Sequence, residues 1–120
     1  MAKNILVVDD DRQIVSLVIR ILERKGHNVS AAYNGRDGLD IAKSKYADNQ
    51  KFDLLISDTI MPVMCGPEFI KEYKNTLDSK IKVFQMSGTE PKIDLADDYI
   101  SKPFDVAEFY SRVEKLLLSD

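Results

Sequence analysis

Aspartate residues gather at two places in this chain where carboxylates could do chemistry together. Asp9–Asp11 follow the short apolar run Asn4–Val8, and Asp58 comes just after the apolar run Phe52–Ile56. Both runs are too short for a stable helix and suit buried parallel strands. Because the carboxyl ends of parallel strands meet at one edge of an open α/β sheet, we expect these carboxylates to converge there.

Carboxylates that converge repel one another unless a cation neutralises them. Oxygen ligands select a hard divalent ion, and a few carboxylates with water molecules are the usual arrangement for Mg²⁺. We therefore predict a Mg²⁺ site made by Asp9, Asp10 and Asp58. The metal pair could instead be Asp10 and Asp11, but Val8 ends the strand, which favours Asp9 and Asp10. The simpler alternative is solvated acids at a helix start and an ordinary turn aspartate.

Two further strand ends add a hydroxyl and an ammonium group to the same edge. Ser87 follows the predicted fourth strand, 82–86, and Lys102 follows the short predicted fifth strand, Tyr99–Ser101. A divalent ion, a lysine and a hydroxyl are together what the oxygens of a phosphoryl group need. Asp58 could then be a nucleophile that forms an aspartyl phosphate. Either residue alone would be read as an ordinary surface residue, but the combination points to phosphoryl transfer.

Helical patterns lie between these strands and after the last one. The first helix begins after Asp11, a capping residue, and Gly26 ends it. The last helix begins at Asp105, which forms a capping box with Glu108. Alternating strands and helices predict an α/β domain with a doubly wound parallel sheet and right-handed crossovers.

The connection between the fourth and fifth strands is short. Eleven residues separate Ser87 from Tyr99, Pro91 interrupts them, and they lack a sustained apolar stripe. A parallel crossover needs about a dozen residues and usually contains a helix. We therefore predict that the helix in this place, the fourth, is short or missing.

Length and composition limit the possible functions. The 120 residues suit a single domain, 1–120, and a net charge of −3 without a basic stripe argues against direct nucleic-acid binding. The single cysteine, Cys65, allows no internal disulfide and fits a reducing cytosol. We find no apolar stretch of membrane-spanning length and no signal-peptide pattern, and we expect a cytoplasmic protein without membrane insertion.

Taken in order, these motifs resemble those of the response-regulator receiver domains of two-component signalling. The matching pieces are Ile-Leu-Val-Val-Asp-Asp ending at residue 10, Asp58-x-x-Met-Pro with Gly66, Ser87-Gly88, and Tyr99-x-x-Lys-Pro-Phe. The resemblance covers essentially the whole chain. It implies a flavodoxin-like, five-stranded parallel sheet in the order 2-1-3-4-5.

The resemblance also implies a role for each acid. Asp58 would be the phosphoacceptor. Asp9 and Asp10 would hold Mg²⁺ together with Asp58 and the backbone carbonyl of Ile60.

Further residues would contact or sense the phosphoryl group. By resemblance, Ser87 and Lys102 would contact its oxygens, and Tyr99 would change rotamer as Ser87 moves. The Lys102–Pro103 peptide bond would be cis. We expect the short connection after Ser87 to be mobile until Asp58 is phosphorylated.

The function implied is a signalling switch that catalyses only its own phosphorylation and dephosphorylation. A phosphohistidine of a sensor kinase or phosphotransfer protein would donate the phosphoryl group, and a monomer would then change its partner binding. The expected contacts with that donor are Ile14, Val15, Pro103 and Phe104.

Two other functions stay open at this point. A degenerate receiver would act as an unphosphorylated interaction module. A Mg²⁺-dependent phosphohydrolase of the haloacid-dehalogenase type would need a second aspartate where this chain has Ile60.

Overall fold

Short apolar runs form the strands of the protein, because their side chains can be buried on both faces of a sheet. A computed structural model describes residues 2–119. Five strands within these residues form one parallel sheet in the predicted order, β2-β1-β3-β4-β5. The strands are β1 (Asn4–Val8), β2 (Asn28–Ala32), β3 (Leu54–Asp58), β4 (Lys82–Ser87) and β5 (Asp98–Ser101).

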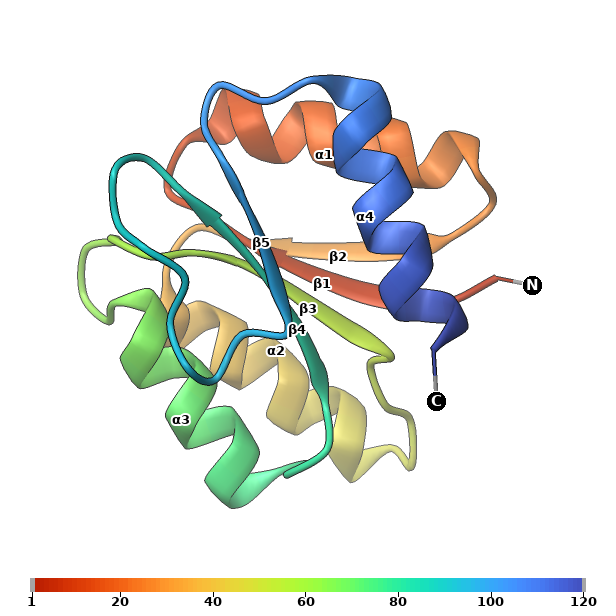
Figure 1. Ribbon diagram of the computed structural model, residues 1–120. Helices are drawn as coiled ribbons and strands as arrows, with labels where there is room; N and C mark the ends of the chain where they lie inside the picture. The colour runs from red at the N-terminus through yellow and green to blue at the C-terminus, as the bar shows by residue number, and fades with distance from the viewer. Residues whose placement is uncertain (1, 120) are drawn as a thin grey trace.

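Helices cover both faces of this sheet, with α1 and α4 on one side and α2 and α3 on the other (Figure 1). The four helices of the described residues are α1 (Arg12–Arg24), α2 (Gly35–Ala47), α3 (Gly66–Thr76) and α4 (Val106–Leu118). Alternate residues of β1 point to the helix layers on the two faces of the sheet. Ile5 and Val7 pack with α1 and α4, whereas Leu6 and Val8 pack with α2 and α3. Within residues 2–119, no helix has the length and apolar content needed to span a membrane.

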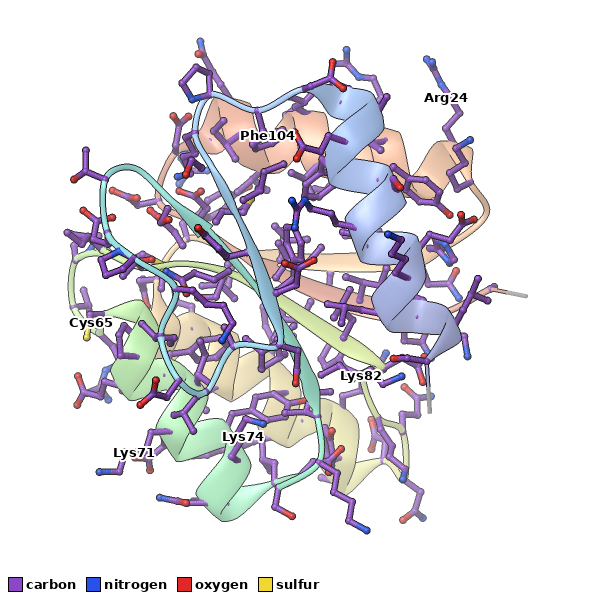
Figure 2. The ribbon with its side chains drawn as sticks, viewed as in Figure 1. Arg24, Cys65, Lys71, Lys74, Lys82 and Phe104 are labelled. Carbon is purple, nitrogen blue, oxygen red and sulfur yellow. The ribbon has the colours of Figure 1, made fainter. Side chains whose placement is uncertain are left out.

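Side-chain contacts fix the helix ends. Asp11 accepts hydrogen bonds from the backbone N–H groups of Gln13 and Ile14, at 2.9 and 3.3 Å. Asp105 accepts one from the N–H of Glu108 at 2.9 Å, so both predicted N-caps are confirmed. At the far end of α4, the Lys82 ammonium donates to the Leu116 carbonyl at 2.8 Å and ties that helix to the start of β4 (Figure 2).

The third strand lies two residues later than its predicted range, Phe52–Ile56. Asp53 precedes the strand and is bonded to β1 at its edge: its N–H donates to the Asn4 carbonyl, and its carboxylate accepts from the Asn4 N–H at 2.8 Å. Pairing with β1 therefore begins at Leu54. Asp58 is in consequence the last residue of β3 rather than the first residue after it.

Among the described residues, no helix connects β4 to β5, which confirms the prediction for this connection. The fourth helix along the chain is α4, and it follows β5. Residues 88–97 run back past α3 as an irregular segment, which we call the strap (Figure 1). Ala96 is buried and Ile93 is half-buried against the core on the α2 and α3 side. These two apolar side chains cover the core where a helix would otherwise pack.

The loop after β3 is held close to the end of its own strand by Gly66. A Cβ atom at Gly66 would lie 2.1 Å from the backbone oxygen of Asp58, and the Gly66 N–H donates to the Thr59 carbonyl at 2.8 Å. Because the contact is with backbone, no side-chain rotation can relieve it.

Gly66→Ala is therefore expected to lower the free energy of unfolding by about 1–3 kcal/mol, measured by chemical denaturation. Gly88→Ala is the matched control, because the nearest atom to its new Cβ would be a flexible carboxylate oxygen at 3.9 Å. We expect that change to stay within about 0.5 kcal/mol. Equal losses from the two substitutions would contradict the close approach at Gly66.

Candidate functional site

The predicted carboxylates do converge, at the edge of the sheet where the parallel strands end. One oxygen each from Asp9, Asp10 and Asp58 lies within 4.8 Å of the other two. The pairing of β1 with β3 places Asp9 next to Asp58, and both side chains are buried, while Asp10 is exposed. Three acids this close make a strongly negative site.

Lys102 reaches this cluster from the end of β5. Its Nζ lies 2.7 Å from Oδ2 of Asp9 and 3.3 Å from Oδ1 of Asp58. Burial lowers the pKa of Lys102, but the hydrogen bond to Asp9 and the charges of Asp9 and Asp58 outweigh burial and raise it. The Lys102–Pro103 peptide bond is cis, as the resemblance implied. The ammonium group is thus held charged between two acids.

The electrostatic environment of Asp58 disfavours its ionised form. Burial first, and then the negative charge of Asp9, raise the pKa of Asp58 to about 6. Lys102 opposes this shift, as does the Thr59 N–H, which donates to Oδ1 of Asp58 at 2.8 Å. At neutral pH the Asp58 carboxylate is therefore ionised, in a place where a further positive charge would stabilise it.

Asp11 caps a helix, which favours Asp9 and Asp10 over Asp10 and Asp11 as the metal pair. Its carboxylate caps α1, and its N–H donates to Oδ1 of Asp9 at 2.9 Å. The site then has three carboxylates against the one ammonium of Lys102, so two negative charges are left over. A divalent cation with oxygen ligands fits both this charge and this donor set.

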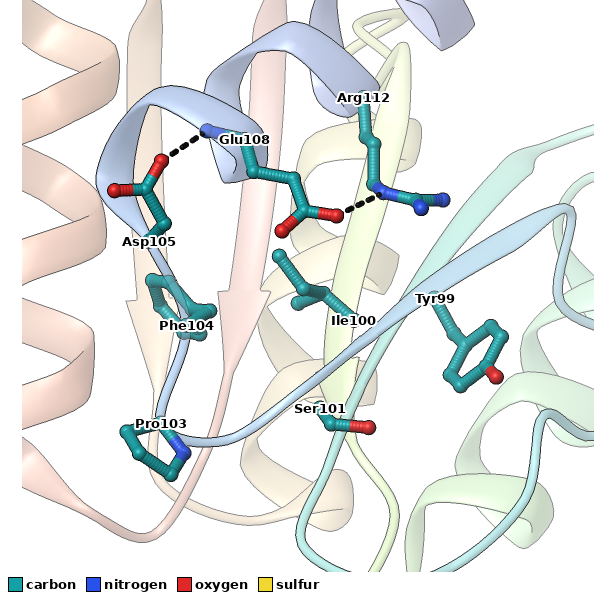
Figure 3. Close-up of a pocket in the computed structure, with 8 residues that line it drawn as sticks. All are labelled: Tyr99, Ile100, Ser101, Pro103, Phe104, Asp105, Glu108 and Arg112. Carbon is teal, nitrogen blue, oxygen red and sulfur yellow. Dashed lines mark hydrogen bonds and ion pairs between the residues drawn. The ribbon is translucent and has the colours of Figure 1, made fainter.

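Ser87 and Tyr99 lie on neighbouring strands. Ser87 ends β4 and is buried, and its hydroxyl donates to the backbone carbonyl of Glu90 at 2.9 Å. Tyr99 lies on β5 with its ring turned away from α4 (Figure 3), and it is 37% exposed. The structure thus places Ser87 at the same sheet edge as the acids, while the roles assigned to both residues stay predictions.

The predicted partner residues divide into two kinds. Val15 is 1% exposed and packs in the core, so the prediction that it contacts a partner is wrong. The buried stripe of α1 runs through Val15, Val18 and Leu22. Ile14 is half-buried and stays a candidate contact.

Pro103 and Phe104 lie at the turn after β5. Pro103 is exposed, and Phe104 is half-buried and stacks on Phe109 with ring centroids 5.0 Å apart. Both line a hollow of about 330 Å³ between β5 and α4 (Figure 3). An exposed turn beside a hollow is compatible with a contact surface, which stays a prediction.

Two buried polar residues near Asp58 were not singled out from the sequence. Thr59 follows the strand and Gln85 lies within β4, and their exposures are 8% and 1%. The Gln85 amide donates to the Thr59 hydroxyl at 2.9 Å. The available signal was a glutamine inside the otherwise apolar run 83–86, where a buried strand favours apolar residues.

The family model for the response regulator receiver domain matches residues 5–114 of this chain. Among curated proteins, the transcriptional regulatory protein CpxR of Escherichia coli (strain K12) is 34% identical over 119 residues, which are 95% of this chain and 49% of that protein. The chain therefore spans about half the length of the curated relatives that it matches.

Solved structures give the same result. The chemotaxis response regulator CheY4 of Vibrio cholerae is similar with a TM-score of 0.82 and 26% identity, over 97% of this chain and 99% of that one. A CheY-like receiver domain protein from Methanospirillum hungatei JF-1 has a TM-score of 0.83 and 27% identity, over 98% and 94%.

The comparisons agree with the site. Receiver domains are signalling domains of two-component systems that partner with histidine kinases, and they are not conventional enzymes. The cluster of Asp9, Asp10 and Asp58 is consistent with the metal site typical of receivers. With a match that runs over residues 5–114, this chain belongs to the response regulator receiver domain family.

Proposed function

We propose that this protein is a phosphorylation switch in which Asp58 accepts a phosphoryl group from a phosphohistidine of a sensor kinase or phosphotransfer protein. The observation that carries the proposal is the meeting of Asp58 with two further acids and Lys102 at one sheet edge. The phosphorylated protein then changes its binding to a protein partner. Following the family, we place it in the cytoplasm. We propose that it is a monomer, because the connection between β4 and β5 has no helix to contribute to the usual dimer face.

The Asp58 carboxylate is the nucleophile of the proposed reaction. Its oxygen forms a bond to phosphorus, the bond from phosphorus to the imidazole nitrogen breaks, and the imidazole keeps that electron pair. The Thr59 N–H orients the carboxylate through Oδ1. The Lys102 ammonium, 3.3 Å from the same oxygen, is placed to stabilise charge on a phosphoryl oxygen. Ser87 is the second proposed donor to those oxygens.

Asp9, Asp10 and Asp58, with the backbone carbonyl of Ile60, are the proposed ligands of Mg²⁺. When bound, this ion supplies positive charge that stabilises the transferring phosphoryl group. The chain itself holds the buried Asp9 carboxyl group 2.7 Å from the Lys102 ammonium, so an acidic ligand is already in place.

Phosphorylation at Asp58 is tested by intact mass after incubation with a small phosphodonor and Mg²⁺. We expect the folded wild type to gain one phosphoryl group, and Asp58→Asn to gain none. Removing Mg²⁺ should abolish the gain. A folded wild type that never gains the group would sink the proposal and favour an unphosphorylated interaction module.

Metal binding predicts a change in thermal stability. At about ten times its dissociation constant, Mg²⁺ should stabilise the folded state by about 1.4 kcal/mol and raise Tm by a few degrees. Asp10→Asn should reduce this shift and raise Tm without metal, because one repelling charge is gone. Asp11→Asn is the matched control, since asparagine is also a good N-cap and the shift should persist. An unchanged Tm in wild type argues against the metal site.

The contact with the phosphodonor is tested with neighbouring residues of α1. Ile14→Glu should slow phosphotransfer from a histidine kinase about tenfold while leaving phosphorylation by a small donor intact. Val15→Ala is the control: it removes buried methyl groups, so it should lower stability by about 1–2 kcal/mol and affect both reactions alike. Equal loss of both reactions in Ile14→Glu would mean that Ile14 is no partner contact.

A further inference from the structure

The strap, residues 88–97, is anchored to the sheet by the side chain of Gln85, although the sequence predicts a mobile connection. Oε1 of Gln85 accepts a hydrogen bond from the Ile93 N–H at 2.7 Å, and Nε2 donates to the Pro91 carbonyl at 2.9 Å. The second hydrogen of Nε2 goes to the Thr59 hydroxyl at 2.9 Å. This carboxamide is 1% exposed and uses its acceptor and both donors, which makes it a firm anchor.

The same side chain is connected to the phosphoacceptor. The Thr59 hydroxyl, which accepts from Gln85, also lies 3.4 Å from the Met86 carbonyl, to which it donates. The Thr59 N–H holds Oδ1 of Asp58. A continuous set of hydrogen bonds therefore runs from Asp58 through Thr59 and Gln85 to Pro91 and Ile93.

A second anchor holds the start of the strap, and it differs from the first in one respect. The Ser87 hydroxyl donates to the Glu90 carbonyl at 2.9 Å. A hydroxyl carries one hydrogen, so Ser87 cannot donate to Glu90 and to a phosphoryl oxygen at the same time. The Gln85 anchor faces no such competition, because its two donors and its acceptor are all used by Thr59 and by backbone groups of the strap.

We propose that Gln85 is a positioning residue. By holding the rest of the strap, it limits the structural change caused by phosphorylation to Gly88–Glu90. The inference rests on the proposed function, in which Ser87 turns to the phosphoryl group. The Glu90 carbonyl then loses its donor, and the exposed residues Gly88 and Thr89 are free to rearrange. Residues 91–97 stay in place, held by Gln85 and by the buried Ala96. The surface that reports phosphorylation is thus the tip of the strap beside the acids.

Residue-resolved NMR of the wild type with Mg²⁺ and beryllofluoride, a phosphoryl mimic, tests this division. The carbonyl carbon of Glu90 should shift as its hydrogen bond is lost, while amide exchange at Ile93 should stay within about twofold. In the unmodified protein, Ser87→Ala should reproduce the Glu90 shift. Faster exchange at Ile93 on addition of the mimic, or a Glu90 signal that neither change moves, would overturn the proposal.

Gln85→Met tests the anchor itself, with Gln50→Met as the matched control at an exposed glutamine. In the unmodified protein, Gln85→Met should speed amide exchange at Ile93 about tenfold. With the mimic, shifts should spread from Gly88–Glu90 to the rest of the strap. Unchanged exchange at Ile93 in folded Gln85→Met would overturn the anchor.

The outcomes separate this inference from the proposed function. If Gln85→Met does not fold, the wild-type and Ser87→Ala measurements still decide the proposal. If the mimic does not bind at Asp58, the amide signals of Asp58, Asp10 and Thr59 stay unchanged. That result would overturn the proposed function and the coupling with it, whereas Ile93 exchange in unmodified Gln85→Met reports on the anchor alone.

Discussion

Electrostatic repulsion among Asp9, Asp10 and Asp58 is the constraint on which this structure depends. Two of these acids are buried, where each charge lacks solvent, and one ammonium group cannot balance three carboxylates. Packing elsewhere must therefore hold β1 and β3 side by side against the repulsion. The core does this with two apolar clusters, one on each face of the sheet, that share the strands between them. The fold stabilises a site that would otherwise push its strands apart.

The fold and the acids could be predicted because the residues that determine them are local. Val8 ends an apolar run directly before Asp9, and Ile56 ends another close to Asp58. The caps Asp11 and Asp105 mark the starts of helices. The order of the strands came from the resemblance to a family rather than from periodicity. The absence of a helix between β4 and β5 could be predicted from the length of this connection, because eleven residues leave no room for an ordinary crossover.

What the sequence could not show depends on contacts between distant segments. Val15 was expected at a partner surface, but the packing of α1 against α4 and the sheet buries it. β3 begins later than predicted because Asp53 bonds to Asn4, which lies 49 residues before it in the sequence. Gln85 gave a visible signal, a polar residue in a buried strand, but its partners lie on two other segments.

The use of hydrogen bonds in place of a helix changes what the β4–β5 connection can do. Apolar packing, as at Ala96, holds a segment without regard to which donor is present. A hydrogen bond holds the segment only while its donor is available, and the donor can leave one acceptor and bond to another. The strap combines both kinds of contact. The exchangeable hydrogen bond from Ser87 holds its start, apolar packing of Ala96 holds its end, and the Gln85 carboxamide holds the residues between them. A connection built in this way is ordered along most of its length and can still change at the end that is bonded to Ser87.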